Sequence, residues 1–303
     1  MGGLRLLITG ANGFLGRACV EAALARGHSV RVLTRRTASF PQEVEAVQGD
    51  LAEGCEAAWL DGIDAVIHTA GSVSNARSTL ARDTRAATNQ LLMAAGAAHA
   101  PPLMVLASSI AVYDADAAGA VDEDTRLETR AKRREAYVGA KLAQEEALRA
   151  SGLQGWCLRI GAIYDSTRRW NAHIGVKKGA VLISLARTGD VPLVQVADAA
   201  EAMICAAETA PNGACEALNI VESPLPSRKA FIAAEHHGLH IPLHWRLLLP
   251  LAWLCEAALA ARAPGLLRPR ILRARMTAVS YPNTRATTRL GWHPQRQFLR
   301  GSK

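Results

Sequence analysis

Short apolar runs alternate with stretches of helical spacing along the first 165 residues of the chain. Leu4–Thr9 is apolar nearly throughout, and Leu15–Arg26 has apolar positions at helical spacing and stops before Gly27, a residue suited to end a helix. Further strands are predicted at Ser29–Thr34, Val44–Val47, Ala65–His68, Leu103–Ala107 and Trp156–Arg159, and further helices at about Leu80–Ala100 and Glu135–Arg149. Strands that are apolar on both faces are typical of a parallel sheet covered by helices on both sides. The pattern therefore predicts an α/β fold with a doubly wound parallel sheet of the Rossmann type.

The alternation ends after Tyr164. Residues 166–190 are basic and are predicted to be irregular, and from Pro224 onward the chain is expected to be mainly helical. Between them, strands are predicted at Val191–Val196 and Glu216–Val221, with a helix at Ala199–Glu208. We therefore predict a dinucleotide-binding domain at 1–165 and 196–222, and a smaller, interleaved, mainly helical substrate-binding region at 166–195 and 223–303.

The glycines between the first strand and the first helix are spaced for binding a nucleotide phosphate. Gly10 permits a tight turn, Gly13 lets the backbone approach a pyrophosphate, and Gly16 allows close packing of the helix on the strand. The start of the helix adds free N–H groups and a partial positive charge. This strand–turn–helix context predicts an NAD(P) site.

The end of the second strand bears on which nicotinamide cofactor is bound. An acidic residue there would hold a ribose 2′-hydroxyl, whereas arginine accommodates a 2′-phosphate. The chain has Thr34, Arg35 and Arg36 at this point and no acid, so NADP is favoured, with NAD kept open.

Composition and charge narrow the class of partner. The net charge is +8, but the arginines are scattered and no basic stripe is interleaved with aromatic residues, so we expect no nucleic acid partner. An anionic cofactor or a membrane surface accounts better for the surplus. The six cysteines form no CxxC pair, so neither a disulfide framework nor a metal site is predicted, and the cytoplasm is the expected location.

Several motifs together resemble the extended short-chain dehydrogenase/reductase family. They are the glycine motif, Asp50-Leu51, His68-Thr69-Ala70-Gly71, Ser108-Ser109, Tyr137-x-x-x-Lys141, Val196-Ala197-Asp198 and Leu290-Gly291-Trp292-His293-Pro294, and they run nearly from end to end. The resemblance implies that Ser109 hydrogen-bonds the substrate oxygen, that Lys141 also holds the nicotinamide ribose, and that the chain forms a homodimer. Besides the glycines, Arg35 and Arg36, the residues expected at the cofactor are Asn12, Phe14, Leu15, Thr34, Asp50, Leu51, Thr69, Ala70, Gly71, Ser108, Tyr137, Lys141, Ile160 and Ile163.

The Tyr137/Lys141 pair also makes chemical sense on its own. The two residues are four positions apart on a predicted helix and so share a face. An ammonium near a phenol favours the phenolate, so Lys141 is expected to lower the pKa of Tyr137. The tyrosine would then exchange a proton with a substrate oxygen while hydride moves at the nicotinamide. Two positions depart from the family: Thr84 stands near where an asparagine often completes the catalytic set, and Ala140 replaces the serine before the lysine.

The substrate class is narrowed by what the motifs lack. Ile110-Ala111 follows Ser109 in place of the Asp-Glu pair of sugar dehydratases. Arg159-Ile160-Gly161-Ala162-Ile163-Tyr164 lacks the asparagine with which nucleotide-sugar epimerases contact a diphosphate. The pattern is closer to the branch of 3β-hydroxysteroid dehydrogenases and dihydroflavonol reductase-like enzymes. We therefore expect alcohol/ketone interconversion on an apolar or mixed-polarity small molecule; the alternatives are a nucleotide-sugar epimerase with bound NAD and a non-catalytic cofactor-sensing protein.

The C-terminal half contains weaker signals. Asn171, His173 and Lys177 follow the sheet's carboxyl edge and are expected to contact substrate. Within residues 241–275, the stretch Ile241–Ala261 is apolar but contains Arg246 and Glu256, which makes it a poor transmembrane helix. It is expected either to pack as a core or dimer-facing helix or to lie on a membrane surface.

Overall fold

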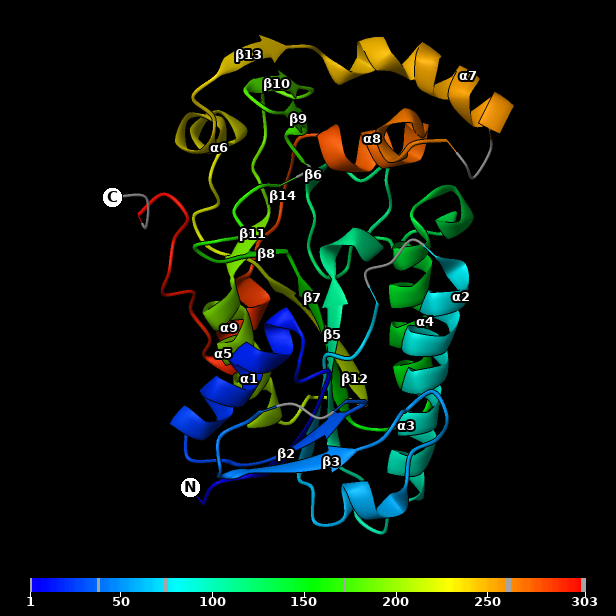
Figure 1. Ribbon diagram of the computed structural model, residues 1–303, viewed down its shortest axis with the longest axis vertical. Helices are drawn as coiled ribbons and strands as arrows, with labels where there is room; N and C mark the ends of the chain where they lie inside the picture. Colours follow the sequence, from blue (N-terminus) through cyan, green and yellow to red (C-terminus); the bar gives the residue numbers. More distant parts are fainter. Residues whose placement is uncertain (1, 37–38, 73–75, 172, 260–262, 301–303) are drawn as a thin grey trace.

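A seven-stranded parallel sheet forms the centre of the molecule. A computed structural model describes residues 2–36, 39–72, 76–171, 173–259 and 263–300, and Figure 1 shows their arrangement. The strands lie in the order β12-β7-β5-β4-β1-β2-β3. Their bounds are β1 Arg5–Thr9, β2 Ser29–Thr34, β3 Val44–Gln48, β4 Ala65–His68, β5 Leu103–Ser109, β7 Gly155–Ile160 and β12 Cys215–Ile220. The order reverses between β1 and β4, where a doubly wound sheet opens a crevice at its carboxyl edge. The predicted Rossmann-type fold is confirmed.

Helices cover both faces of this sheet because its central strands are apolar on both sides. Leu6 and Ile8 of β1 belong to one core, together with residues of helices α1 (Phe14–Ala25) and α5 (Val196–Ala207). Leu7, between them, belongs to the opposite core, with residues of α3 (Ala87–Ala97) and α4 (Ala136–Ala150). The expected helix at Leu80–Ala100 is divided into α2 (Arg77–Leu80), a π-helical turn at Ala81–Ala86, and α3.

The segment after Tyr164 is more regular than expected. Within residues 166–190, which were predicted to be irregular, strands β9 (Gly175–Lys178) and β10 (Val181–Ser184) form an antiparallel pair, and β13 (Leu239–Pro242) adds to it in parallel. The turn between β9 and β10 contains Gly179 at a φ of 58°. Four-residue strands are too short for their periodicity to be read reliably. Farther on, β11 (Leu193–Gln195) pairs with β8 (Ala162–Tyr164) in a small separate sheet.

Most of the remaining elements lie beyond the carboxyl edge of the main sheet. Helices α6 (Arg228–Glu235), α7 (Leu249–Leu259) and α8 (Pro269–Met276) occupy this end of the molecule, above β5 in Figure 1. The chain then returns through β14 (Val279–Ser280), which pairs with β6 (Gly119–Ala120), to α9 (Thr284–Leu290). Ala286 of α9 and the following Trp292 are buried in the core that contains α1 and α5. The last part of the chain therefore packs against the core formed by α1, α5 and one face of the main sheet.

A buried carboxyl group joins the C-terminal segment to the small sheet. Glu222 follows β12 and is 2% exposed. Its Oε2 accepts hydrogen bonds from the Tyr164 hydroxyl at 2.9 Å and from the Phe298 backbone N–H at 3.2 Å. Burial raises the pKa of Glu222 to about 7. The folded state therefore favours the neutral carboxylic acid.

Replacing Glu222 with glutamine should make stability less dependent on pH. A carboxyl group whose pKa rises on folding stabilises the fold fully at low pH, and this contribution is lost as pH rises through about 7. At pH 8 the free energy of unfolding of Glu222→Gln should therefore exceed that of the wild type by up to roughly 3 kcal/mol, and the variant should melt at a higher temperature. At pH 4 the two proteins should differ little. Thermal melts at the two pH values check this, with the exposed Glu43→Gln as the matched control. A difference that is the same at both pH values would contradict the assignment.

Candidate active site

The glycine turn after β1 brings three pieces of backbone into close contact. Gly10 has a φ of 72°, and a Cβ placed on it would lie 2.6 Å from the Ala70 nitrogen. A Cβ on Gly16 would lie 2.2 Å from the Gly10 carbonyl oxygen. Side chains are therefore excluded at both positions, and α1 starts directly against the turn.

A cleft of about 470 Å³ lies along this turn, and its lining fits a dinucleotide. Gly13 precedes α1 with an extended backbone and no capping side chain, and the first turn of the helix contains no acidic residue. The backbone N–H groups at the start of α1 are therefore available to a phosphate. The cleft is lined by Thr9–Gly13, Leu33–Arg36, Gly49–Leu51, Thr69–Ser72, Asp83 and Ala87. This set includes most of the residues expected at the cofactor.

The two arginines after β2 differ in their surroundings. Arg35 lies 3.1 Å from Asp83, measured from Nη1 to Oδ1. Arg36 lines the same cleft and is exposed, and no ion pair joins it to another residue in the described part of the chain. Arg36 is therefore the guanidinium better placed to meet an added phosphate.

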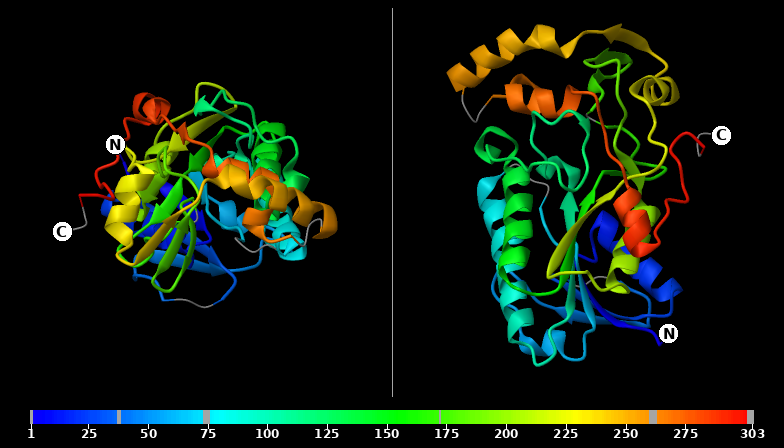
Figure 2. Two further views of the ribbon diagram at one scale, coloured as in Figure 1. Left: turned by 90° about the horizontal axis from the view of Figure 1, so that it is seen from above. Right: turned by 180° about the vertical axis from the view of Figure 1, so that it is seen from behind.

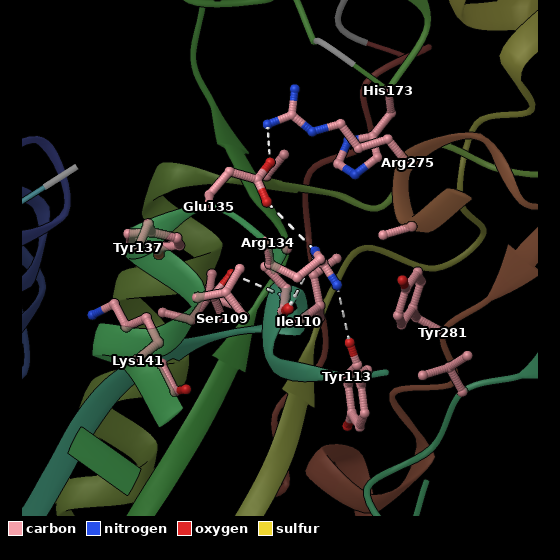
Figure 3. A pocket seen from close by; sticks show the side chains of 18 of the residues that line it. Ser109, Ile110, Tyr113, Arg134, Glu135, Tyr137, Lys141, His173, Arg275 and Tyr281 are labelled. Carbon is pink, nitrogen blue, oxygen red and sulfur yellow. Dashed lines mark hydrogen bonds and ion pairs between the residues drawn. The ribbon is translucent and has the colours of Figure 1, made fainter. Parts of the chain in front are cut away.

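A second cavity, of about 570 Å³, contains the Tyr/Lys pair. Tyr137 and Lys141 stand one turn apart on α4, and Ser109 ends the neighbouring strand β5 (Figure 3). Thr69, Gly71 and Ser72 line both cavities, so the cleft along the glycine turn opens onto Ser109, Tyr137 and Lys141. Leu15, Ile160 and Ile163 also line the second cavity.

Lys141 is held by polar groups inside the protein. Its Nζ donates to the Ala107 carbonyl oxygen at 2.7 Å and to Gln144 Oε1 at 3.0 Å, and the residue is 7% exposed. Burial lowers the pKa of Lys141 to about 8, although the Glu145 carboxylate raises it. The ammonium is therefore the main form at neutral pH, with a neutral amine within reach at alkaline pH.

The pKa of Tyr137 differs from the sequence-based expectation. Burial raises it above its usual value, while hydrogen bonding with Ser109 opposes the rise. Lys141 does not lower it here, because its ammonium points to Ala107 and Gln144 and lies 5.8 Å from the centroid of the tyrosine ring. Tyr137 is therefore a protonated phenol, the form that donates a proton.

A chain of buried hydrogen bonds connects Lys141 to the first strand. Gln144 donates from Nε2 to Thr88 Oγ1 at 2.7 Å, His68 Nε2 meets the same oxygen at 2.9 Å, and His68 Nδ1 lies 2.7 Å from Thr9 Oγ1. Burial lowers the pKa of His68 to about 3, with a further contribution from the Lys141 charge, so the imidazole is neutral. This network ties α4, α3, β4 and β1 together behind the two cavities.

Charged side chains line the end of the second cavity that lies away from Lys141 (Figure 3). Glu135 Oε1 lies 2.6 Å from Arg275 Nη2, and Glu135 Oε2 lies 3.5 Å from Arg134 Nε (Figure 3). His173 lies beside them, and its Nδ1 is 2.6 Å from Asn171 Oδ1. Burial, with the charges of Arg275, Arg228 and Arg134, lowers the pKa of His173 to about 3, so this imidazole is neutral.

Some predicted site residues lie elsewhere. Lys177 does not line either cavity: its ammonium lies 5.2 Å from the Trp170 ring centroid and donates to the Glu235 carbonyl oxygen, because β9 points it to the surface. Thr84 is buried behind the cofactor cleft, where Oγ1 accepts the Ser72 N–H at 3.0 Å. Phe14 packs under the Arg168 guanidinium, with 4.5 Å between the guanidinium carbon and the ring centroid. Ser108 lines the second cavity but donates its hydroxyl to Glu145.

The sequence analysis missed several residues that line the second cavity. Arg134 and Glu135 stand directly before the Tyr137 helix, and their charge next to that motif was a usable signal. Tyr113 follows Ser109 by four residues and belongs to the same motif, whereas Arg275 and Tyr281 gave no such signal, because only the fold brings them to the cavity. In the described part of the chain, no group of three or more His, Cys, Asp or Glu residues could hold a metal ion.

Comparison with known proteins agrees with this geometry. The model of the NAD dependent epimerase/dehydratase family matches residues 6–220. The chain is 31% identical over 217 residues to a ceramide reductase of Caulobacter vibrioides, covering 69% of this chain and 62% of that protein. It is 29% identical to a 3-diazoavenalumate denitrifying reductase of Streptomyces sp over 96% of both chains. Among solved structures, MoeE5 in complex with UDP-glucuronic acid and NAD has a similar fold, with a TM-score of 0.73 and 20% identity over 98% of this chain and 96% of that one.

Gln144 is predicted to set the pH range in which Lys141 works. Gln144→Leu keeps the bulk of the side chain but removes one of the two acceptors of the ammonium, so the pKa of Lys141 should fall further below about 8. The alkaline limb of kcat/KM for the reduced cofactor should move to lower pH, because that limb reports groups of the free enzyme. The exposed Gln154→Leu is the control. A lower rate with an unshifted limb would mean that Gln144 is only structural.

Proposed function

Since this chain belongs to the NAD dependent epimerase/dehydratase family, we propose that it interconverts an alcohol and a ketone on a largely apolar or mixed-polarity small molecule, using NAD(P). The observation that carries the proposal is the meeting of the two cavities at Thr69, Gly71 and Ser72, next to Tyr137 and Lys141. Most of the catalytic cavity's other lining is apolar, with Ile110, Val121, Val138, Ile160, Ile163 and Val279 among its members.

The chain's own residues supply the proton chemistry. A bound reduced nicotinamide supplies hydride to the carbonyl carbon of a ketone. Tyr137 then gives its phenolic proton to the carbonyl oxygen, and Ser109 holds that oxygen by a hydrogen bond. Burial raises the pKa of Tyr137, so the phenol is protonated at neutral pH, which is the form that reduction requires. The Lys141 ammonium stabilises the phenolate left after the transfer.

The family comparison is consistent with either nicotinamide cofactor, and we propose NADP as the preferred one. Support comes from Arg36, an exposed guanidinium on the cofactor cleft, and from the absence of an acid at Thr34–Arg36.

Arg36→Ser should weaken NADPH much more than NADH. A charge-assisted hydrogen bond contributes about 1.5–3 kcal/mol, so the Kd for NADPH should rise by roughly ten- to a hundredfold while that for NADH stays close to the wild-type value. Fluorescence titration of both cofactors measures this, with the exposed Arg130→Ser as control. Equal losses for the two cofactors would contradict the role given to Arg36.

One observation favours the epimerase alternative. Arg134 and Arg275 bring two guanidiniums to the same end of the cavity as Glu135, and guanidiniums bind diphosphate oxygens through paired hydrogen bonds, although Glu135 pairs with both arginines and Glu128 also pairs with Arg134. The two functions differ in their use of cofactor. A reductase consumes free NADPH, whereas an epimerase keeps bound NAD and gives no net absorbance change.

Tyr137→Phe provides the decisive test of the proposed chemistry. The wild type should oxidise NADPH with a panel of alkyl and aryl ketones, and Tyr137→Phe should lose roughly 10²- to 10⁴-fold in turnover with near-normal cofactor binding. Tyr281→Phe removes a phenol from the opposite side of the same cavity and should lose far less. Full turnover in Tyr137→Phe would refute the role. Wild-type protein that purifies with NAD and leaves NADPH unchanged would favour the epimerase.

A further inference from the structure

The outward face of α7 is apolar, whereas a helix on a protein surface normally presents polar residues to water. The helix packs on the protein through Ala252, which is fully buried in a cluster with Leu272 and Met276 of α8. Away from that contact, the exposed apolar residues of the helix and of the turn before it are Leu247, Pro250, Leu251, Trp253, Leu254, Ala257, Ala258 and Leu259. Leu247 and Leu254 are each 69% exposed and Trp253 is 52% exposed.

The strand that leads into α7 extends this apolar surface. In β13, Leu239 is 61% and Ile241 is 44% exposed, and they pair with Val181 and Ile183 of β10. Val176 of β9, 51% exposed, is the partner of Ile183 on the other side, so these side chains share one face of the small sheet. Figures 1 and 2 place β13 and α7 together at the end of the molecule farthest from β3.

Cations and tryptophans border the apolar residues. Lys178 of β9 is exposed and pairs with Val181, so it lies on the apolar face of the small sheet, whereas the exposed Lys177 next to it belongs to the other face. Arg246 is exposed just before α7, with its guanidinium 5.6 Å from the Trp245 ring centroid. Trp170, beside Lys177, is 40% exposed. Tryptophan and basic side chains around an apolar face are typical of helices that lie at a bilayer surface.

We propose that this surface, formed by α7, β13 and the β9–β10 pair, docks on an anionic lipid bilayer. No helix in the described part of the chain is long and apolar enough to cross a membrane, so α7 would lie in the interface with its outward leucines among the acyl chains. Lys178 and Arg246 would meet lipid phosphates. The proposal does not depend on the reaction proposed above.

The charges favour a bilayer over a second copy of the chain. A symmetric dimer through this surface would bring the same patch of both copies together. Both copies would then contribute Lys178 and Arg246 to one interface, and Glu256 is the one acidic residue on α7 to offset these charges. Anionic headgroups complement this charge instead.

Docking would also place the catalytic cavity near the membrane. Ala274 and Arg275 of α8 line that cavity, and α8 packs against the inner side of α7. One layer of helix would therefore separate the cavity wall from the lipid surface.

Vesicle co-sedimentation tests the docking surface. The full-length protein is mixed with vesicles of equal parts phosphatidylcholine and phosphatidylglycerol, and with vesicles of phosphatidylcholine alone. We expect binding to the anionic vesicles that weakens with added salt. Leu251→Asp/Leu254→Asp should lower the partition coefficient by roughly tenfold or more, because two side chains lose their apolar contact with lipid. Lys178→Glu/Arg246→Glu should lower binding to anionic vesicles and leave the weaker binding to neutral vesicles unchanged.

Met93→Asp is the matched control. Met93 is 71% exposed on α3, away from α7, so its replacement adds one aspartate, against two in the α7 variant, at another apolar surface position. It should sediment with anionic vesicles as the wild type does, and equal melting temperatures would show that all variants are folded. Wild-type protein that stays in the supernatant, or α7 variants that bind like the wild type, would overturn the proposal. A concentration-dependent dimer that the α7 substitutions dissociate, without vesicle binding, would assign the surface to a second copy.

Discussion

The buried ammonium of Lys141 imposes the strictest constraint on this structure. A charge removed from water must be met by fixed polar groups, and here the Ala107 carbonyl oxygen and Gln144 meet it. The first acceptor belongs to β5 and the second to α4, so the charge fixes the helix to the strand. Tyr137, one turn earlier on α4, is thereby held at the carboxyl edge of the sheet. Gln144 is oriented in turn by Thr88, which also meets His68. The positions of Tyr137 and Lys141 therefore depend on Gln144, Thr88 and His68, which line neither cavity.

The same interior accounts for the acid–base character of the site. Burial disfavours every charge within it, which lowers the pKa of Lys141 and raises that of Tyr137. Because the Lys141 ammonium donates to the Ala107 carbonyl oxygen and to Gln144, it does not favour loss of the Tyr137 proton in the free protein. In the proposed ketone reduction, the phenolate left on Tyr137 would offer the ammonium an opposite charge and change this balance. The arrangement therefore favours the lysine–tyrosine attraction when the proton has left rather than before.

How much could be predicted from sequence depended on how locally each feature is encoded. The glycine turn, Ser109 and the Tyr137/Lys141 pair each lie within a short motif, and the structure brings them together around two joined cavities. The pKa of Tyr137 was not predictable from spacing, because it depends on where the Lys141 side chain finds acceptors. Arg275 and Tyr281 come from segments more than a hundred residues beyond Tyr137, and no local pattern announces them. Lys177 lines neither cavity, unlike the expectation from sequence. The hairpin of β9 and β10 was too short to be recognised, and the alternation of side chains along β9 directs Lys177 outward.

Arg228 shows how the distant segments reach the cavity. Its guanidinium is 2% exposed and donates to the carbonyl oxygens of Thr188, Arg275, Met276 and Thr277. Three of these oxygens lie at the end of α8, where the carbonyls have no partner within the helix and the helix dipole favours a cation. Burial lowers the pKa of Arg228 to about 10, yet the group remains charged at neutral pH. Burying a cation that is not bonded to a carboxylate is unfavourable. Here the hydrogen bonds that the guanidinium makes with the carbonyl oxygens at the end of α8 offset this desolvation. The hydrogen bonds of Arg228 fix the positions of Arg275 and Thr277, which line the second cavity. This end of the cavity is therefore shaped by capping of the α8 backbone and not by a short sequence motif.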